Sequence, residues 1–250
     1  MKNLSEILLS REIHRWYSPN LNKDMEIVVY GHYGFALLMF PTAAADFLEY
    51  ERFKLIDSIG WFLGEGKIKA YSINSINNES WLNNNMHPAH KALRHQQYNK
   101  YIVEEVVPFI HNHSKGLVPI ITTGASLGAL HAANNFFRRP DIFSGTIAMS
   151  GSYDLKTYSK GYYDDNVYFN SPIDYLPHWN DQFMLEKMKK GKIIIASGQG
   201  DYEDPNASRK LSDILHSKGV NHWLDLWGHD IKHDWPTWRQ MLPYFLSKFN

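Results

Sequence analysis

The chain has 250 residues, enough to bury a sizeable hydrophobic core, and we expect residues 1–250 to form a single domain. Its 26 Lys and Arg residues balance 26 Asp and Glu residues, so charge gives no reason to expect nucleic acid or an anionic membrane as a partner. The absence of cysteine excludes disulfides, a cysteine nucleophile and cysteine-ligated metal sites.

The amino-terminal residues predict neither export nor membrane insertion. Residues 1–11 contain no long apolar run and carry Glu6 early, so we expect no secretory signal. No segment approaches the ~18 consecutive apolar residues of a membrane helix. The expected location is cytoplasmic.

The apolar pattern predicts strands that alternate with helices. Two strands come first and resemble an antiparallel pair, and a buried strand then ends at Pro41. Regular alternation follows, which indicates an α/β protein with a mostly parallel central sheet and helices on both faces. The expected strands are 12–17, 25–30, 35–40, 67–73, 118–122, 146–149, 192–196 and 222–227, and the expected helices are 47–62, 92–110, 127–138, 207–217 and 238–248.

One long connection interrupts this alternation. Residues 153–190 are rich in Tyr, Asn and Asp and contain two prolines. A connection of this length is usually an insertion over a site rather than a plain loop. We expect it to act as a cap or a cleft wall.

A G-x-S-x-G motif stands between a predicted strand and a predicted helix. Gly124 and Gly128 leave room for a tight turn that holds the Ser126 hydroxyl above the edge of the sheet. In such a turn the Leu127 N–H points toward the oxyanion that forms during acyl transfer. The motif therefore predicts Ser126 as a catalytic nucleophile.

A serine nucleophile needs a base and an orienting carboxylate, which follow it in this order along the chain: acid, then histidine. Asp201 comes first after the strand 192–196 and is the preferred acid, with Glu203 and Asp204 as rivals; Asp204 is also placed to cap the next helix. After the last strand His233 precedes the closing helix and is preferred as the base over His229.

Several stretches together resemble the "putative esterase" branch of the α/β-hydrolases, which includes esterase D, feruloyl esterase and mycolyltransferase-like proteins. They are residues 40–43, 79–81, 104–108, 124–128, 197–201 and 233–238, and they span nearly the whole chain. The resemblance implies the α/β-hydrolase fold with Ser126, Asp201 and His233 as nucleophile, acid and base. It also implies a second oxyanion N–H in the loop after residue 40, at Thr42 or Ala43, where many relatives have glycines instead.

Other histidine pairs invite a metal interpretation that the pattern does not favour. His87 and His90 lie in a polar loop, and the H-x-x-x-H of His229 and His233 has Asp230 where a zincin has Glu. We predict no metal and no cofactor. Trp81, His87 and Arg94 are candidates for a substrate-contacting cleft wall, and a structural role is the alternative for Trp81.

Three functions are compatible with these residues: a serine carboxylesterase that works through an acyl-enzyme, an acyltransferase with the same triad, and a non-catalytic binding protein of the same fold. The intact set of Ser126, Asp201 and His233 favours the first two. The expected partner is a small-molecule ester, with no nucleic acid and no membrane, and homo-oligomer formation is left open.

Overall fold

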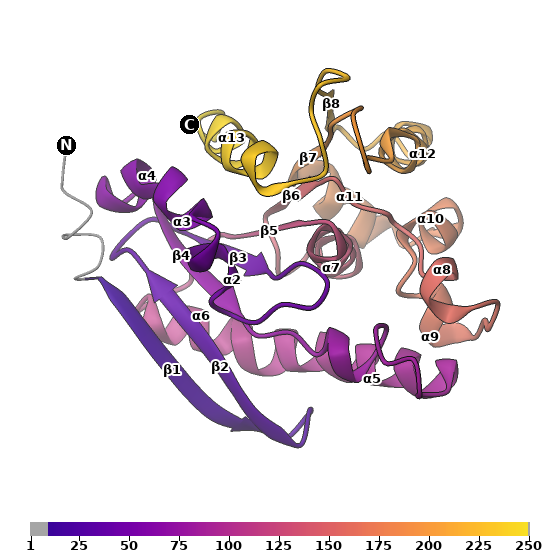
Figure 1. Ribbon diagram of the computed structural model, residues 1–250, viewed down its shortest axis with the longest axis horizontal. Helices are drawn as coiled ribbons and strands as arrows, with labels where there is room; N and C mark the ends of the chain where they lie inside the picture. The colour runs from indigo at the N-terminus through magenta and orange to yellow at the C-terminus, as the bar shows by residue number, and fades with distance from the viewer. Residues whose placement is uncertain (1–9, 250) are drawn as a thin grey trace.

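A computed structural model describes residues 10–249 of the chain, so most of the segment expected to lack a secretory signal lies outside the described residues. Within that range one eight-stranded sheet runs through the molecule in the order β1-β2-β4-β3-β5-β6-β7-β8 (Figure 1). The strands are β1 (Arg11–Ser18), β2 (Lys23–Tyr30), β3 (Phe35–Phe40), β4 (Ile68–Ile73), β5 (Ile120–Ala125), β6 (Gly145–Met149), β7 (Lys192–Ser197) and β8 (Trp223–Leu226).

The sheet is antiparallel at its beginning and parallel elsewhere. β2 pairs antiparallel with both β1 and β4, and every later pairing is parallel. The inner strands are apolar on both faces, as in the sequence Phe-Ala-Leu-Leu-Met-Phe of β3, because helices cover the sheet from both sides. The predicted α/β class with a mostly parallel sheet is confirmed.

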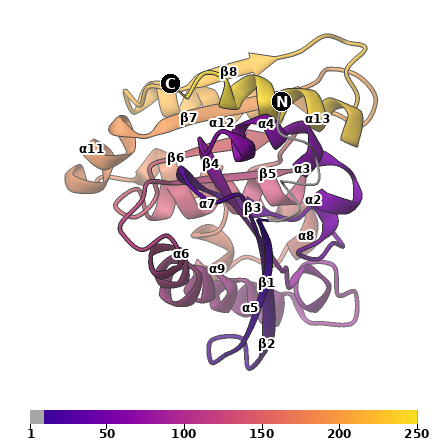
Figure 2. The same cartoon turned by 90° about the vertical axis from the view of Figure 1, so that its left-hand side faces the viewer.

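Two helical layers enclose the sheet (Figures 1 and 2). One apolar core joins the sheet to a layer that includes α5, α6, α7 and α12, and the second core joins the opposite face to α2, α3, α4 and α13. These helices are α2 (Glu49–Arg52), α3 (Leu55–Ser58), α4 (Gly60–Gly64), α5 (Pro88–Tyr101), α6 (Val107–His113), α7 (Leu127–Arg138), α12 (Pro205–Ser217) and α13 (Trp235–Leu246).

The helix predicted over 47–62 is wrong as a single element. Three short helices, α2, α3 and α4, replace it, and Lys54 between the first two has a left-handed backbone with φ of 59°. A left-handed residue cannot continue a right-handed helix. The helix predicted over 92–110 extends further at both ends. It consists of α5 and α6, which are joined by a π-helical turn, η2 (Ile102–Val106).

The insertion at residues 153–190 folds into short helices at the side of the sheet. They are α8 (Lys156–Ser159), α9 (Asp165–Tyr168), α10 (Pro172–Tyr175), η3 (Leu176–His178) and α11 (Gln182–Lys190). Leu155 and Val167 from this segment pack into a small apolar cluster with Leu127 at the start of α7. The insertion therefore borders the residue that follows the predicted nucleophile.

The order of the strands reverses direction at the centre of the sheet. From β3 the chain moves to β4 on one side and then to β5 on the other, so β3 lies between them. Ligands of open α/β sheets bind beyond the carboxyl ends of the strands at such a reversal. The loops after β3 and β5 meet there. None of the helices in the described part of the chain is long and apolar enough to span a membrane.

A buried polar chain ties α7 to the loop after β3. The Nε2 of His131 lies 2.9 Å from the Asn77 amide oxygen, and the Asn77 amide donates to the Thr42 carbonyl at 3.2 Å. His131 is 1% exposed, and its Nδ1 has no hydrogen-bond partner. Burial lowers the pKa of His131 to about 4, because a charged ring would be desolvated with an unsatisfied N–H.

This shift predicts acid sensitivity. Below pH 6.5 the unfolded chain takes up a proton at His131 that the folded protein accepts only near pH 4, so the free energy of unfolding falls by up to about 3 kcal/mol across that window. We expect His131→Gln to reduce this pH dependence in urea denaturation measured from pH 7 to pH 4. The matched variant of the exposed His216, His216→Gln, should keep the wild-type slope. An unchanged slope in His131→Gln would contradict the assignment.

Candidate active site

Ser126 occupies a strained turn between β5 and α7. Its φ of 57° and ψ of −125° lie in a region that residues other than glycine rarely adopt. The turn needs its glycines: a Cβ on Gly124 would come within 2.4 Å of the Gly128 backbone, and one on Gly128 within 2.3 Å of the Phe40 carbonyl oxygen. This geometry matches the nucleophile-elbow arrangement that the motif predicts.

Free backbone donors lie beside this turn. Ser126 stands at the amino end of α7, where the first N–H groups, including that of Leu127, have no partner within the helix. Gly128 packs against the carbonyls of Phe40 and Pro41, which brings the loop after β3 to the same place. Ala43 of that loop packs against the apolar cluster that contains Leu127.

The two candidate residues in that loop differ in their hydrogen bonds. Thr42 donates its N–H to Glu49 at 2.8 Å and its hydroxyl to the same carboxylate at 2.5 Å. Burial raises the pKa of Glu49, although these hydrogen bonds from Thr42 oppose the shift. No partner engages the N–H of Ala43 among residues 10–249. Ala43 therefore has the donor that remains available.

A carboxylate contacts His233, and it belongs to Glu203. The Oε2 of Glu203 lies 3.4 Å from the Nδ1 of His233, and the Glu203 side chain is 0% exposed. Ser150 donates its hydroxyl to Glu203 at 2.7 Å, and Ser197 does so at 3.1 Å. Burial opposes ionisation of Glu203, but the hydrogen bonds from His233, Ser150 and Ser197 outweigh it, so its pKa lies below the ordinary value.

The side chain of Asp201 lies at the surface. Its exposed carboxylate pairs with Lys232 at 2.7 Å, and only its backbone carbonyl meets His233, accepting the N–H at 3.0 Å. Between the two acids Tyr202 has a left-handed φ of 65°, and this turn directs Glu203 inward while Asp201 stays at the surface. Asp204 caps α12 by accepting from two backbone N–H groups, as expected.

The two histidines that are candidates for the base also differ in their burial and contacts. His233 is partly buried, packs edge-on against Trp238 at a centroid distance of 5.1 Å, and lies in the loop between β8 and α13. His229 is exposed. No hydrogen bond joins the Ser126 hydroxyl to His233 in the described part of the chain, and such contacts are often long before substrate binds.

Shared contacts join the loops that carry Ser126, Glu203 and His233. The Ser126 N–H donates to the Met149 carbonyl at 3.0 Å. The next residue, Ser150, receives a hydrogen bond from the Trp238 indole at 3.0 Å while it donates to Glu203. Ser150 thus links the end of β6 to Glu203 and to α13.

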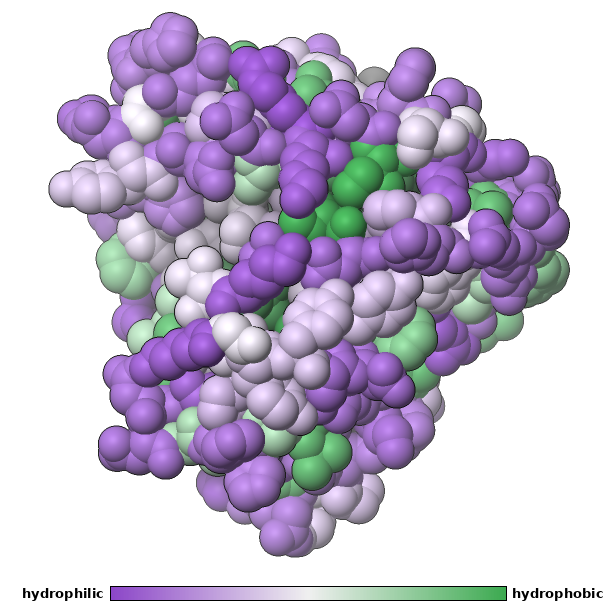
Figure 3. Space-filling view, turned by 90° about the vertical axis from the view of Figure 1, so that its right-hand side faces the viewer, coloured by the Kyte–Doolittle hydropathy of each residue, from purple (hydrophilic) through white to green (hydrophobic). Residues whose placement is uncertain are grey.

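An apolar wall stands beside the elbow. Leu127, Leu155 and Val167 form a buried cluster with Trp81, and Tyr158 and Tyr162 of the insertion pack on it. Figure 3 shows the side of the molecule toward which β3 points in Figure 1; its surface is mainly hydrophilic, with hydrophobic side chains in recesses between polar ones. Of this cluster only the residues packed on it, Ala43, Tyr158 and Tyr162, are partly exposed, and Leu127 within it follows Ser126 directly.

The three predicted wall residues have different surroundings. Trp81 is 2% exposed and donates its indole N–H to the His95 Nδ1 at 2.8 Å. His87 is exposed at the start of α5, where its ring packs near Tyr162. Arg94 donates to Glu79 at 2.8 Å, so its charge is already paired.

One group of side chains in the described residues has the spacing of metal ligands. Glu12 lies 3.2 Å from the Nε2 of His14 and 3.1 Å from the Nε2 of His113. The group belongs to β1 and the end of α6, whereas Ser126 follows β5 near the middle of the sheet. The hydrogen bonds to Glu12 account for this arrangement without an ion.

A strained serine at the head of a helix, a histidine on a buried carboxylate and free backbone donors are the parts that acyl transfer requires. With the parallel sheet, they define an α/β-hydrolase. Residues 71–248 match the family model described as "Putative esterase". The chain belongs to this family and is a hydrolase.

Solved structures agree on the fold. A ferulic acid esterase is 17% identical with a TM-score of 0.73, and 94% of this chain and 95% of that chain are covered. The fluorophosphonate-binding serine hydrolase F of Staphylococcus aureus is 16% identical with a TM-score of 0.71, covering 95% and 97%. MPT51 of Mycobacterium tuberculosis is 15% identical with a TM-score of 0.70, covering 95% and 97%. No curated protein sequence matches the chain significantly.

The crowding at the elbow predicts a specific sensitivity. Gly128→Ala would place a Cβ against the Phe40 and Pro41 carbonyls, so we expect a loss of about 1–3 kcal/mol of unfolding free energy, measured by urea denaturation. The matched control is Gly64→Ala in α4, where a Cβ meets nothing within 4 Å and stability should hold or rise. Equal stability of the two variants would show that the elbow tolerates the methyl group.

Proposed function

We propose that the protein is a serine carboxylesterase in which Ser126 is the nucleophile, His233 the base and Glu203, in place of Asp201, the acid. The observation that supports this most is the buried Glu203 carboxylate at the His233 Nδ1, 3.4 Å away. A carboxylate at Nδ1 fixes the ring so that Nε2 is free to act on the serine hydroxyl. The exposed pair of Asp201 with Lys232 lacks this contact.

The proposed reaction has two halves. His233 accepts the Ser126 proton as the serine oxygen attacks the ester carbonyl, and then gives that proton to the leaving alcohol. Water, deprotonated by His233, attacks the acyl-enzyme and releases the carboxylic acid with Ser126 restored. The low pKa of Glu203 keeps it ionised while the imidazolium forms, so the ion pair is present when it is needed.

The oxyanion is assigned to two backbone donors. Leu127 N–H at the start of α7 is one, and Ala43 N–H is the other because Glu49 already holds that of Thr42. Removal of one oxyanion donor typically costs about 100- to 1000-fold in rate. The hydrogen bonds from Thr42 to Glu49 then have a positioning role, since they fix the loop that presents Ala43.

The apolar wall favours an ester with an apolar or aryl acyl group. Tyr158 and Tyr162, the partly exposed residues of the insertion that pack on the cluster around Leu127, carry no charge. A neutral small-molecule ester is therefore the proposed substrate class. Trp81 has a supporting role behind this wall, because its indole N–H is committed to His95.

The first test is hydrolysis of short-chain p-nitrophenyl esters together with labelling by a fluorophosphonate. Ser126→Ala should lose both, with turnover reduced by about a million-fold, and His233→Ala should be nearly as inactive. His229→Ala is the matched control and should retain activity, because His229 is exposed. A folded wild type without turnover or labelling would overturn the proposal.

The assignment of the acid has its own test. We expect Glu203→Gln to lower kcat by about 1000-fold or more, because an amide can neither stabilise the imidazolium nor hold the required tautomer. Asp201→Asn breaks only an exposed pair with Lys232 and should change kcat less than about threefold. A large loss in Asp201→Asn with an active Glu203→Gln would restore Asp201 as the acid. Thermal melting of both variants separates catalytic loss from unfolding.

A further inference from the structure

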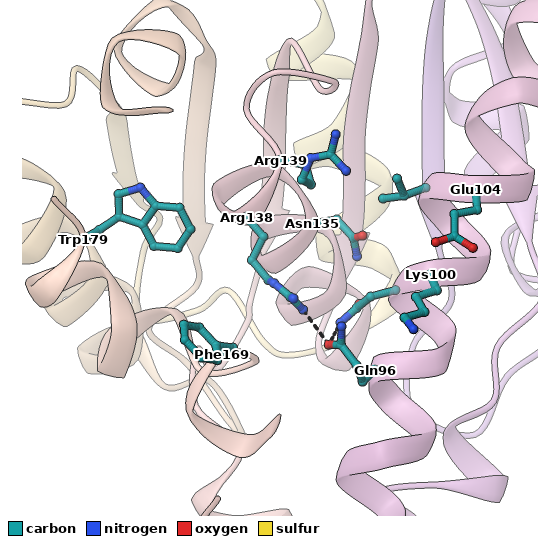
Figure 4. A pocket seen from close by; sticks show the side chains of 10 residues that line it. Gln96, Lys100, Glu104, Asn135, Arg138, Arg139, Phe169 and Trp179 are labelled. Atoms are coloured by element: carbon teal, nitrogen blue, oxygen red, sulfur yellow. Dashed lines mark hydrogen bonds between the residues drawn. The ribbon is translucent and has the colours of Figure 1, made fainter. Parts of the chain in front are cut away.

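A cavity of about 390 Å³ lies at the opposite end of α7 from Ser126 (Figure 4). Its walls come from α5 and the π-helical turn η2, from the last residues of α7, and from the insertion near α9 and η3. The helix has 12 residues, so about 18 Å separates its two ends. None of the residues proposed for catalysis lines this cavity.

The cavity contains an arginine without a counter-ion. Arg138 donates one guanidinium nitrogen to the amide oxygens of Gln96 at 2.9 Å and Asn170 at 3.1 Å, and both partners are neutral. No carboxylate within residues 10–249 pairs with it. Burial lowers the pKa of Arg138, which reflects the cost of a poorly solvated charge.

The other charges in the wall cancel or are exposed. Arg139 is neutralised by a bidentate pair with Asp141 at 2.8 and 2.7 Å. Lys100 and Glu104 are both exposed and of opposite sign. One positive charge therefore remains for a ligand, and a monoanion matches it better than a dianion. The guanidinium fork suits a carboxylate.

Polar atoms in the same wall also lack partners. Asn99 is 7% exposed, and its amide donates to Asn170 at 2.6 Å, but its Oδ1 accepts nothing. The indole N–H of Trp179 is likewise buried without an acceptor. Buried polar groups are rarely left unpaired, because each costs free energy comparable to a lost hydrogen bond. Two side chains of the wall thus hold a buried acceptor and a buried donor that have no hydrogen-bond partner among residues 10–249.

The remaining wall provides flat apolar surface and unusual backbone. Phe169 is 43% exposed, and Trp179 stands near it on the same side of the cavity in Figure 4. Val103 lies in the π-helical turn, a rare form that occurs mostly as single turns inside α-helices and is frequent at functional sites.

We propose that this cavity is a second ligand site, which binds a small organic monocarboxylate with a flat apolar body. The carboxylate binds the guanidinium of Arg138, the body lies against Phe169 and Trp179, and a hydroxyl on the body donates to the Asn99 Oδ1. The site does not depend on the proposed esterase function.

Isothermal titration with benzoate, 4-hydroxybenzoate and benzyl alcohol tests the proposal. The protein is first treated with a fluorophosphonate so that a ligand cannot enter a reactive active site. If the fluorophosphonate does not label the protein, the proposed function fails, and the same titration still tests the cavity. We expect saturable binding of both carboxylates, tighter binding of 4-hydroxybenzoate, and none of benzyl alcohol.

Variants locate the binding. Arg138→Gln should weaken both carboxylates by about tenfold or more, since it removes a charge-assisted hydrogen bond. Arg209→Gln is the matched control on the exposed part of α12 and should bind as the wild type does. Asn99→Leu should abolish the preference for the hydroxylated ligand while benzoate still binds. Thermal melting of each variant reports whether it is folded.

Three results would overturn the proposal. They are the absence of saturable carboxylate binding, equal binding by Arg138→Gln and wild type, and inorganic phosphate binding as tightly as benzoate. The last would mean that the cavity holds an inorganic anion without regard to an organic body.

Discussion

The structure depends on one steric constraint, the close approach of backbone to backbone around Ser126. β5 and α7 meet so tightly that Gly124 faces the backbone of Gly128, and Gly128 in turn lies against the carbonyls at the end of β3. This crowding forces Ser126 into its strained conformation and brings the loop after β3 beside the amino end of α7. Strain of this kind persists only where the surrounding structure over-determines it. Here the central strands and the helix above them do so.

Around that turn, two buried carboxylates, Glu203 and Glu49, fix the hydrogen bonds of their neighbours. Glu203 is buried yet ionised because three donors converge on it, and its charge is directed at one ring nitrogen of His233. Glu49 performs the complementary task by taking up both donors of Thr42. Each carboxylate takes up particular donors. Under the proposed function, the groups left for the reaction are the Ala43 N–H and the second ring nitrogen of His233, neither of which has a hydrogen-bond partner among residues 10–249.

The sequence predicts the features that depend on residues close to one another along the chain. The elbow, the inner strands and the order of strand and helix follow from short apolar runs and two glycines, and the structure confirms the fold. The choice between Asp201 and Glu203 is not local, because it rests on the left-handed turn at Tyr202 and on partners from distant segments, Lys232 and Ser150. The choice between Thr42 and Ala43 depends on Glu49 in the same way. The broken helix after β3 escaped prediction because its pattern is helical while Lys54 is left-handed.

The insertion at 153–190 gives α7 two different environments. Near Ser126 it contributes Leu155, Tyr158 and Val167, which carry no charge. At the other end it contributes Phe169 and Trp179 to a cavity that is also lined by Arg138, which pairs with no carboxylate among residues 10–249. Under the proposed function, a neutral ester suits the first environment. Under the proposed second site, a carboxylate suits the other end, where Arg138 pairs with no carboxylate among residues 10–249. If both proposals hold, the two ends of one helix take the uncharged and the charged forms of the same class of molecule.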